Sequence, residues 1–180
     1  LTTPDSTELQ KYFSEMVRAK STIVAFEASS HGLEQYRLSG TSIDTAILTS
    51  FSNDHLDFHK TINNYKNAKR RLFNELKPKN IILNIDNNLG DEIYKDLKKG
   101  RKPNTFFSVS GKKEADFQYS FSRTNKDKIK VKLRTPEKEV LFKLNTVSRP
   151  LASNVICALA AFLSRGYNLD NIYQNLEKLT

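Results

Sequence analysis

Ile81-Ile82-Leu83-Asn84-Ile85 is the stretch that decides the fold of this chain. Apart from Asn84, its side chains are apolar and mostly β-branched, without the regular polar alternation of a half-exposed strand. This pattern is typical of a strand that is buried on both faces of a parallel sheet. Ile23 to Phe26 and Thr45 to Thr49 have the same character. The three segments therefore predict three parallel strands.

Helical periodicity lies between and around these segments. Residues 7 to 20 carry apolar side chains at helical spacing, with Ser6 as the expected N-cap. Further helices are expected over about 61 to 76 and from 86 to 97. Strands that alternate with helices in this way predict an α/β fold, in which helices flank a mostly parallel sheet joined by right-handed crossovers.

The pattern changes from about residue 104. Phe117, Tyr119 and Phe121 alternate with polar residues, and the apolar residues between 129 and 133 do the same. A period of two predicts strands with one buried and one wet face, so we expect a small antiparallel sheet over about 117 to 146, attached to the parallel one.

Two helices are expected after this sheet, one over Ser153 to Arg165 that Gly166 ends and a short one over about Asp170 to Leu179. We expect a single domain. Its parallel core would comprise residues 1–103 and 148–180, and its antiparallel appendage residues 104–147.

Composition narrows the class of protein. No apolar run is long enough to span a membrane, and the single cysteine, Cys157, lies in an apolar run where a small core residue is expected. A reducing cytoplasm is the expected location. The formal charge of +9 favours an anionic partner. A nucleic-acid surface is not expected, because the basic residues are scattered and no aromatic residues lie among them.

Lys69 lies in the middle of the apolar stripe of the predicted helix over 61 to 76, whereas Lys66, Arg70 and Arg71 are expected to point elsewhere, into solvent. One interpretation is that its aliphatic stem follows the core and brings the amine to the surface. The other is that a buried and easily neutralised amine takes up carbon dioxide. The resulting carbamate is an anion with oxygen donors, which suits magnesium.

Two further polar residues follow predicted strands. Glu27 directly follows the segment from 23 to 26, which places a carboxylate at the carboxyl edge of the sheet, where α/β proteins bind ligands. His55 follows the segment from 45 to 49, and all three histidines of the chain occur between residues 31 and 59. Glu27, His55 and Lys69 could therefore meet around one divalent cation.

Together these residues resemble the middle, ATP-binding domain of the Mur ligases, and most closely the MurE type, which adds the third amino acid of the peptidoglycan stem peptide. The matching pieces, in order along the chain, are Thr2-Thr3-Pro4-Asp5-Ser6, Glu27-Ala28-Ser29-Ser30-His31-Gly32-Leu33, Gln35, Arg37, Asp54-His55-Leu56-Asp57-Phe58-His59, Tyr65, Ala68-Lys69 and Asn84-Ile85-Asp86. The resemblance covers nearly the whole chain.

The resemblance implies a P-loop-type fold and an ATP-driven amide synthesis in the cytoplasm. Its partners would be a UDP-N-acetylmuramoyl dipeptide and a diamino acid. Catalysis and the binding of Mg²⁺ would fall to Glu27, His55 and a carbamylated Lys69. The residues that would contact the UDP-muramoyl dipeptide are Thr2, Thr3, Ser29, Gln35 and Arg37, and Asn154 would face the adenine of ATP.

The sequence departs from the family pattern in three ways. It has no phosphate loop of the Gly-x-x-Gly-Lys-Thr type, and no domain that would receive the incoming amino acid. Ser50, Asn53 and the run from 148 to 151 also differ from the residues usual in the family. We therefore expect a fragment that works with N- and C-terminal domains of the same protein and is inactive alone.

Two other functions remain open at this stage. The first is a metal-dependent hydrolase that uses Asp54, His55, Asp57 and His59 as its ligands, which would leave Glu27 and Lys69 without a role. The second is a noncatalytic module that binds a nucleotide or a nucleic acid.

Overall fold

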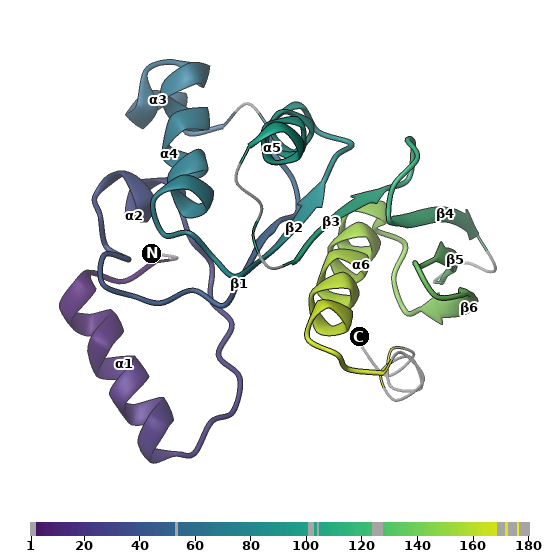
Figure 1. The fold of residues 1–180 in the computed structure, drawn as a ribbon, viewed down its shortest axis with the longest axis horizontal. Helices are drawn as coiled ribbons and strands as arrows, with labels where there is room; N and C mark the ends of the chain where they lie inside the picture. The colour runs from purple at the N-terminus through teal and green to yellow at the C-terminus, as the bar shows by residue number, and fades with distance from the viewer. Residues whose placement is uncertain are drawn as a thin grey trace. The chain divides into compact units, whose positions relative to one another are not determined.

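The computed structural model of the chain describes residues 3–52, 54–100, 103, 105–123, 128–168, 172 and 176. The chain divides into two compact units (Figure 1). The first unit comprises residues 1–43 and 53–78, and the second comprises 44–52 and 79–180. No helix in the described part of the chain is long and apolar enough to cross a membrane.

The second unit is built on one six-stranded sheet with the strand order β1-β2-β3-β4-β5-β6. The strands are β1 (Thr45–Leu48), β2 (Asn80–Asn84), β3 (Thr105–Ser110), β4 (Phe117–Arg123), β5 (Ile129–Arg134) and β6 (Glu139–Leu144). Strands β1 to β4 pair in parallel, and the β4–β5 and β5–β6 pairs are antiparallel. The predicted mixed α/β fold is confirmed.

The antiparallel strands continue the parallel sheet. Strand β3 pairs in parallel with β2, so the change of pattern at residue 104 precedes one more parallel strand. Strand β4 belongs to both parts, because it pairs in parallel with β3 and antiparallel with β5. The two compact units also divide the chain differently from the prediction, which grouped residues 1–103 with 148–180 and set 104–147 apart. As a division into domains, those ranges stay a prediction.

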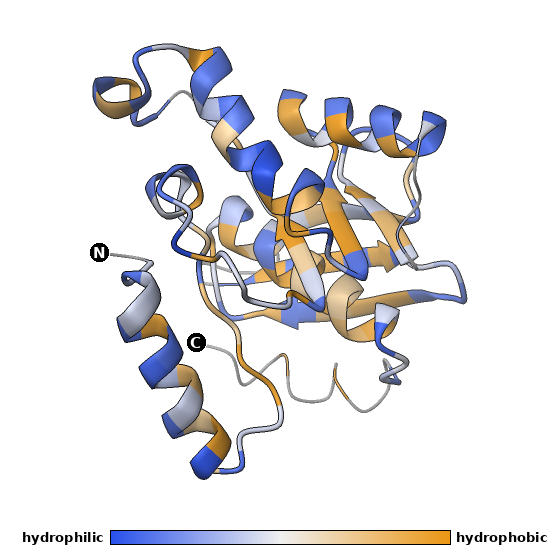
Figure 2. Ribbon diagram, turned by 60° about the vertical axis from the view of Figure 1, so that its left-hand side comes forward, coloured by the Kyte–Doolittle hydropathy of each residue, from blue (hydrophilic) through white to orange (hydrophobic). Residues whose placement is uncertain are grey.

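Helices α5 (Asn88–Lys99) and α6 (Arg149–Ser164) lie on opposite faces of this sheet (Figure 1). All five residues of β2 are buried, as expected for a strand that is covered on both faces. Figure 2 shows hydrophobic residues along the strands, and those of several strands form one core with the apolar face of α6. Cys157 is fully buried in α6, as predicted, and burial raises the pKa of its thiol to about 12.

Helix α6 begins earlier than predicted. Ser148 is its N-cap, so the helix starts at Arg149 with Pro150 in its first turn. Proline is favoured there because the first N–H groups of a helix have no partner within it. At the other end Gly166 has a φ of +80°, which confirms its predicted role after the last turn. The predicted helix over about 170 to 179 lies largely outside the described residues.

The first unit contains helices α1 (Ser6–Arg18), α2 (Ser30–Glu34), α3 (Leu56–His59) and α4 (Ile62–Asn74). Its apolar cluster is small. The buried members are Leu9, Leu33 and Leu38, with Phe13, Ala28, Leu72 and Leu76 packed against them. The sequence pattern predicted α1 and α4 but not α2 or α3, because helices of one turn are too short to show periodicity.

The predicted strand over Ile23 to Phe26 is wrong. The segment pairs with no strand in the described part of the chain, and Ile23, Val24 and Phe26 are 55%, 40% and 38% exposed. Apolar composition favours a strand, but a strand forms only where a neighbouring strand takes up its backbone hydrogen bonds. Glu27 therefore does not follow a strand in the described part of the chain, and its place at the carboxyl edge of the sheet stays a prediction.

The N-cap of α1 is Asp5 rather than the predicted Ser6. The Asp5 carboxylate accepts the N–H groups of Thr7 at 2.9 Å and Glu8 at 3.0 Å. We expect Asp5→Ala to destabilise α1 by about 1 kcal/mol, because these N–H groups lose their acceptor. Hydrogen exchange of the first-turn amides would measure the effect. Ser6→Ala is the matched control, and equal loss of protection in both variants would contradict this assignment of the cap.

Candidate functional site

Thr3 connects two of the predicted site residues in the first unit. Its side chain is buried and donates a hydrogen bond to the backbone oxygen of Glu27 at 2.7 Å. The same Oγ1 accepts the N–H of Ser29 at 2.9 Å. Helix α2 approaches Thr3 closely, because a Cβ added at Gly32 would lie 2.8 Å from the Thr3 Cβ. A glycine at the start of α2 thus lets Thr3 lie against the segment that follows Glu27.

Arg37 extends this network. Its Nη1 donates to the backbone oxygen of Thr3 at 2.5 Å, and its Nε and Nη2 donate to Oε1 of Gln35 at 2.9 and 2.6 Å. The predicted substrate contacts Thr3, Ser29, Gln35 and Arg37 therefore belong to one hydrogen-bonded group. Thr2, the remaining predicted contact, lies outside the described residues.

Lys69 is partly buried on α4, and its Nζ donates to the backbone oxygen of Ala28 at 3.1 Å. Burial lowers the pKa of this amine, whereas the nearby charge of Glu27 acts in the opposite direction. The fold thus places Lys69 beside the Glu27 segment, 42 positions earlier in the chain. An amine with a lowered pKa is more easily neutral, which is the form that reacts with carbon dioxide.

His55 has an unusual backbone conformation directly before α3. Its φ is +54° and its ψ is +27°, the left-handed region that non-glycine residues seldom adopt. The Asp54 carboxylate accepts the N–H of His55 at 2.8 Å, and its other oxygen lies 3.7 Å from Nε2 of the imidazole. Uncommon backbone conformations of this kind are frequent at functional sites.

The three histidines form a cluster with two other aromatic rings. His55 lies edge-on to His31, with ring centroids 5.2 Å apart, and edge-on to Tyr65 at 5.9 Å. The ring centroid of Phe58 lies 4.0 Å from that of His31. The sequence carries one sign of this cluster, because all three histidines occur between residues 31 and 59. It did not show that Tyr65, on the turn of α4 before Lys69, would join them.

His59 is the most buried member of the cluster, with 4% of its surface exposed. Its Nε2 is buried and has no hydrogen-bond partner among the residues that the structure describes. Burial and the neighbouring His31 lower the pKa of this imidazole, although Glu34 raises it. A buried polar atom without a partner costs about 1–3 kcal/mol, so the imidazole nitrogen of His59 is buried at a cost to stability.

Two sets of metal ligands were predicted from the sequence, one for the ligase and one for the hydrolase alternative. Within the part of the chain that the structure describes, no three histidine, cysteine, aspartate or glutamate side chains are grouped to hold a metal ion. This finding does not support the hydrolase alternative, which needed Asp54, His55, Asp57 and His59 as a cluster. Glu27 and His55 supply one carboxylate and one imidazole, and a carbamate on the lowered-pKa amine of Lys69 would add oxygen donors that fit Mg²⁺.

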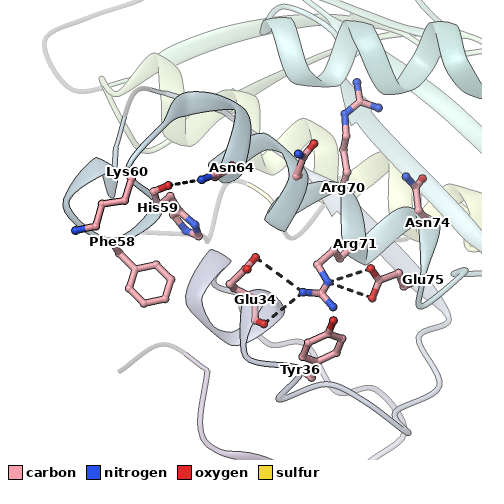
Figure 3. A pocket seen from close by; sticks show the side chains of 11 residues that line it. Glu34, Tyr36, Phe58, His59, Lys60, Asn64, Arg70, Arg71, Asn74 and Glu75 are labelled. Carbon is pink, nitrogen blue, oxygen red and sulfur yellow. Dashed lines mark hydrogen bonds and ion pairs between the residues drawn. The ribbon is translucent and has the colours of Figure 1, made fainter.

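A polar pocket of about 730 Å³ lies beside α2, α3 and α4 (Figure 3). Its lining residues are Glu34, Tyr36, Phe58, His59, Lys60, Asn64, Asn67, Arg70, Arg71, Asn74 and Glu75. Arg71 forms ion pairs with Glu34 and Glu75 and stacks 3.6 Å over the Tyr36 ring. Two of the lining residues, Phe58 and His59, belong to the aromatic cluster described above, and Figure 3 shows the His59 imidazole directed toward Glu34.

The second unit holds Asn154, the predicted adenine contact. It is exposed on α6 and follows Ser153, whose Oγ lies 2.9 Å from the Tyr119 hydroxyl. Asn84, the last residue of β2, donates to the same Oγ at 3.2 Å. This buried group fixes the first turns of α6 to the end of β2, and thereby fixes the backbone that carries Asn154.

The Mur ligase middle-domain family model matches residues 1–162 of the chain. The UDP-N-acetylmuramoyl-L-alanyl-D-glutamate–2,6-diaminopimelate ligase of Blochmanniella floridana is 35% identical over 99% of the chain and 36% of its own length. The corresponding L-lysine ligase of Staphylococcus epidermidis is 32% identical, with the same coverage. The chain therefore spans about a third of the length of these curated relatives.

Solved structures of Mur ligases are also similar to this chain. A UDP-N-acetylmuramoyl-L-alanyl-D-glutamate–2,6-diaminopimelate ligase has a TM-score of 0.88 and 27% identity, over 98% of this chain and 36% of its own. MurF from Acinetobacter baumannii has a TM-score of 0.63 and 18% identity over 76% of this chain and 29% of its own, which establishes likeness of fold alone.

Proposed function

Because the chain belongs to the Mur ligase family, whose middle domain it matches, we propose that it is the ATP-binding part of an ADP-forming ligase. This enzyme would add a diamino acid to UDP-N-acetylmuramoyl-L-Ala-D-Glu during peptidoglycan precursor synthesis in the cytoplasm. The observation that carries the proposal is the match along nearly the whole chain, in sequence and in structure, to ligases of that name. Diaminopimelate and lysine are the diamino acids in the names of its relatives.

The proposed reaction has two steps. The terminal carboxylate of the dipeptide attacks the γ-phosphorus of ATP, the bond to the β-phosphate oxygen breaks, and ADP leaves. The amino group of the diamino acid then attacks the acyl phosphate, loses a proton and releases phosphate, so that an amide forms. The first step brings anions together, and holding the attacking carboxylate in line with the leaving ADP is the main task of the protein.

The residues that would hold Mg²⁺ are Glu27, His55 and carbamylated Lys69. The ion supplies charge neutralisation for the crowded phosphate and carboxylate oxygens. Lys69 suits its part because burial favours the neutral amine, which adds to carbon dioxide and loses a proton to give a carbamate. The hydrogen bond from Lys69 to Ala28 directs the end of this side chain toward the Glu27 segment.

Thr3, Ser29, Gln35 and Arg37, together with Thr2, would bind the UDP-muramoyl dipeptide. The guanidinium of Arg37 joins Thr3 to Gln35, which supports a shared role in orienting the substrate. Asn154 would contact the adenine from the exposed side of α6. The formal charge of +9 suits a substrate that carries a diphosphate and carboxylates.

The test uses the full-length protein. Purified enzyme is incubated with ATP, Mg²⁺, UDP-N-acetylmuramoyl-L-Ala-D-Glu and either diaminopimelate or lysine, and the release of phosphate and the tripeptide product are measured. Phosphate release that requires the UDP-muramoyl dipeptide and one diamino acid supports the proposal. Phosphate release that is indifferent to the dipeptide overturns it. The 180-residue chain alone is expected to give no product.

Arg37→Lys is expected to raise KM for the UDP-muramoyl dipeptide by about tenfold, with a smaller effect on KM for ATP. Lysine keeps the positive charge, but its compact ammonium does not reproduce the planar fork with which the guanidinium reaches Thr3 and Gln35. Steady-state kinetics of the full-length enzyme measure both constants. Arg18→Lys, on the exposed end of α1, is the control. Unchanged KM values in Arg37→Lys would remove Arg37 from the substrate site.

A further inference from the structure

Helix α3 is a single turn, and His59 is its one buried side chain. A helix of this length is not stable by itself, so its position depends on the contacts of its buried residue. The His59 N–H donates to the backbone oxygen of His55 at 3.0 Å. The backbone oxygen of His59 accepts from Nδ2 of Asn64 at 2.9 Å, which attaches the turn to α4. The backbone of His55 is thus fixed through His59.

The His59 ring also supports both rings that touch His55. It stacks on Tyr65 with centroids 5.2 Å apart and an interplanar angle of 24°, and it lies 5.6 Å from His31. These are the two rings that His55 meets edge-on, at interplanar angles of 86° and 85°. His59 therefore contacts both of the rings that flank the His55 imidazole.

We propose that His59 is a positioning residue, which orients the His55 imidazole through Tyr65 and His31. This inference rests on the proposed function, in which His55 holds a divalent cation. In this role His59 contacts neither the cation nor the substrate. The His59 ring acts through packing, because stacking on Tyr65 and contact with His31 both require a flat side chain at this position. Replacing a residue that orients a metal ligand by a hydrogen bond commonly changes metal affinity by 10- to 100-fold, and we expect an effect at the lower end of that range for orientation by packing.

The test measures Mn²⁺ binding to the full-length protein by electron paramagnetic resonance, without nucleotide or peptide, in His59→Ala, His59→Phe and Leu56→Ala variants. Leu56 is 42% exposed on the same turn and is the matched control. We expect His59→Ala to weaken Mn²⁺ binding by about tenfold. His59→Phe, which keeps a flat ring, and Leu56→Ala are expected to bind as the wild type does. Thermal unfolding of each variant is recorded in parallel.

Three results would overturn the inference. His59→Ala could lower the unfolding temperature and leave Mn²⁺ affinity unchanged, which would make the role of His59 structural. His59→Phe could lose as much affinity as His59→Ala, which would assign the effect to the imidazole nitrogens. Leu56→Ala could weaken binding equally, which would assign it to general disturbance of α3.

A fourth variant separates this inference from the proposed function. If His55→Ala keeps full Mn²⁺ affinity, His55 is not a ligand and the proposed metal site fails, and the positioning role fails with it. If His55→Ala loses affinity while His59→Ala keeps it, only the positioning role of His59 fails.

Discussion

Lys69→Ala is expected to reduce the turnover of the full-length enzyme by about 10²- to 10³-fold, the size of effect seen when one charge-stabilising group is removed from an active site. The alanine can neither become a carbamate nor hold Mg²⁺. The amine is partly buried, donates to Ala28 and has a lowered pKa, so it is suited to that modification. Production of ADP that depends on the UDP-muramoyl dipeptide is the measurement.

Lys66→Ala, one turn earlier on the same helix, is the matched control and is expected to keep its activity. A second measurement tests the carbamate directly. Full-length protein in ¹³C-labelled bicarbonate is expected to show a carbamate signal by NMR that is missing in Lys69→Ala. Turnover of Lys69→Ala at the wild-type rate would remove this residue from the mechanism.

Gly90→Ala is expected to give the largest loss of stability of the changes considered, at about 3 kcal/mol or more. A Cβ at this position would lie 2.0 Å from the backbone oxygen of Asn84, so the first turn of α5 would have to move away from the end of β2. That turn is tied down, because Asn87 accepts the N–H of Gly90 at 2.9 Å and donates to Asn84 at 2.6 Å. Thermal and urea unfolding of the 180-residue chain would measure the loss.

Asn88→Ala is the control for Gly90→Ala. Asn88 is the first residue of α5 and is exposed, so its replacement is expected to change stability by about 0.5 kcal/mol or less. Equal unfolding midpoints for the two variants would mean that α5 moves to accommodate the methyl group without cost. The predicted rigidity of the junction between β2 and α5 would then be wrong.

The sequence was sufficient to predict those helices and strands whose hydrophobic periodicity reflects which of their faces is buried. The segments from 45 to 49 and from 81 to 85 form parallel strands, and the alternation around 117 and 131 marks antiparallel ones. Isolated single turns such as α2 and α3 gave no periodic signal. The segment from 23 to 26 gave a false one, since its apolar residues resemble a strand but no strand pairs with it in the described part of the chain.

By itself the sequence determined the mixed α/β fold and the family, because hydrophobic periodicity and the order of short motifs are properties of the chain. Only the tertiary structure decided which residues meet. It placed Lys69 against Ala28, made Thr3 the link between Glu27 and Ser29, and stacked His59 on Tyr65. The physical reason is that these contacts join residues from different elements, and their burial and pKa shifts arise only when the packed helices exclude water.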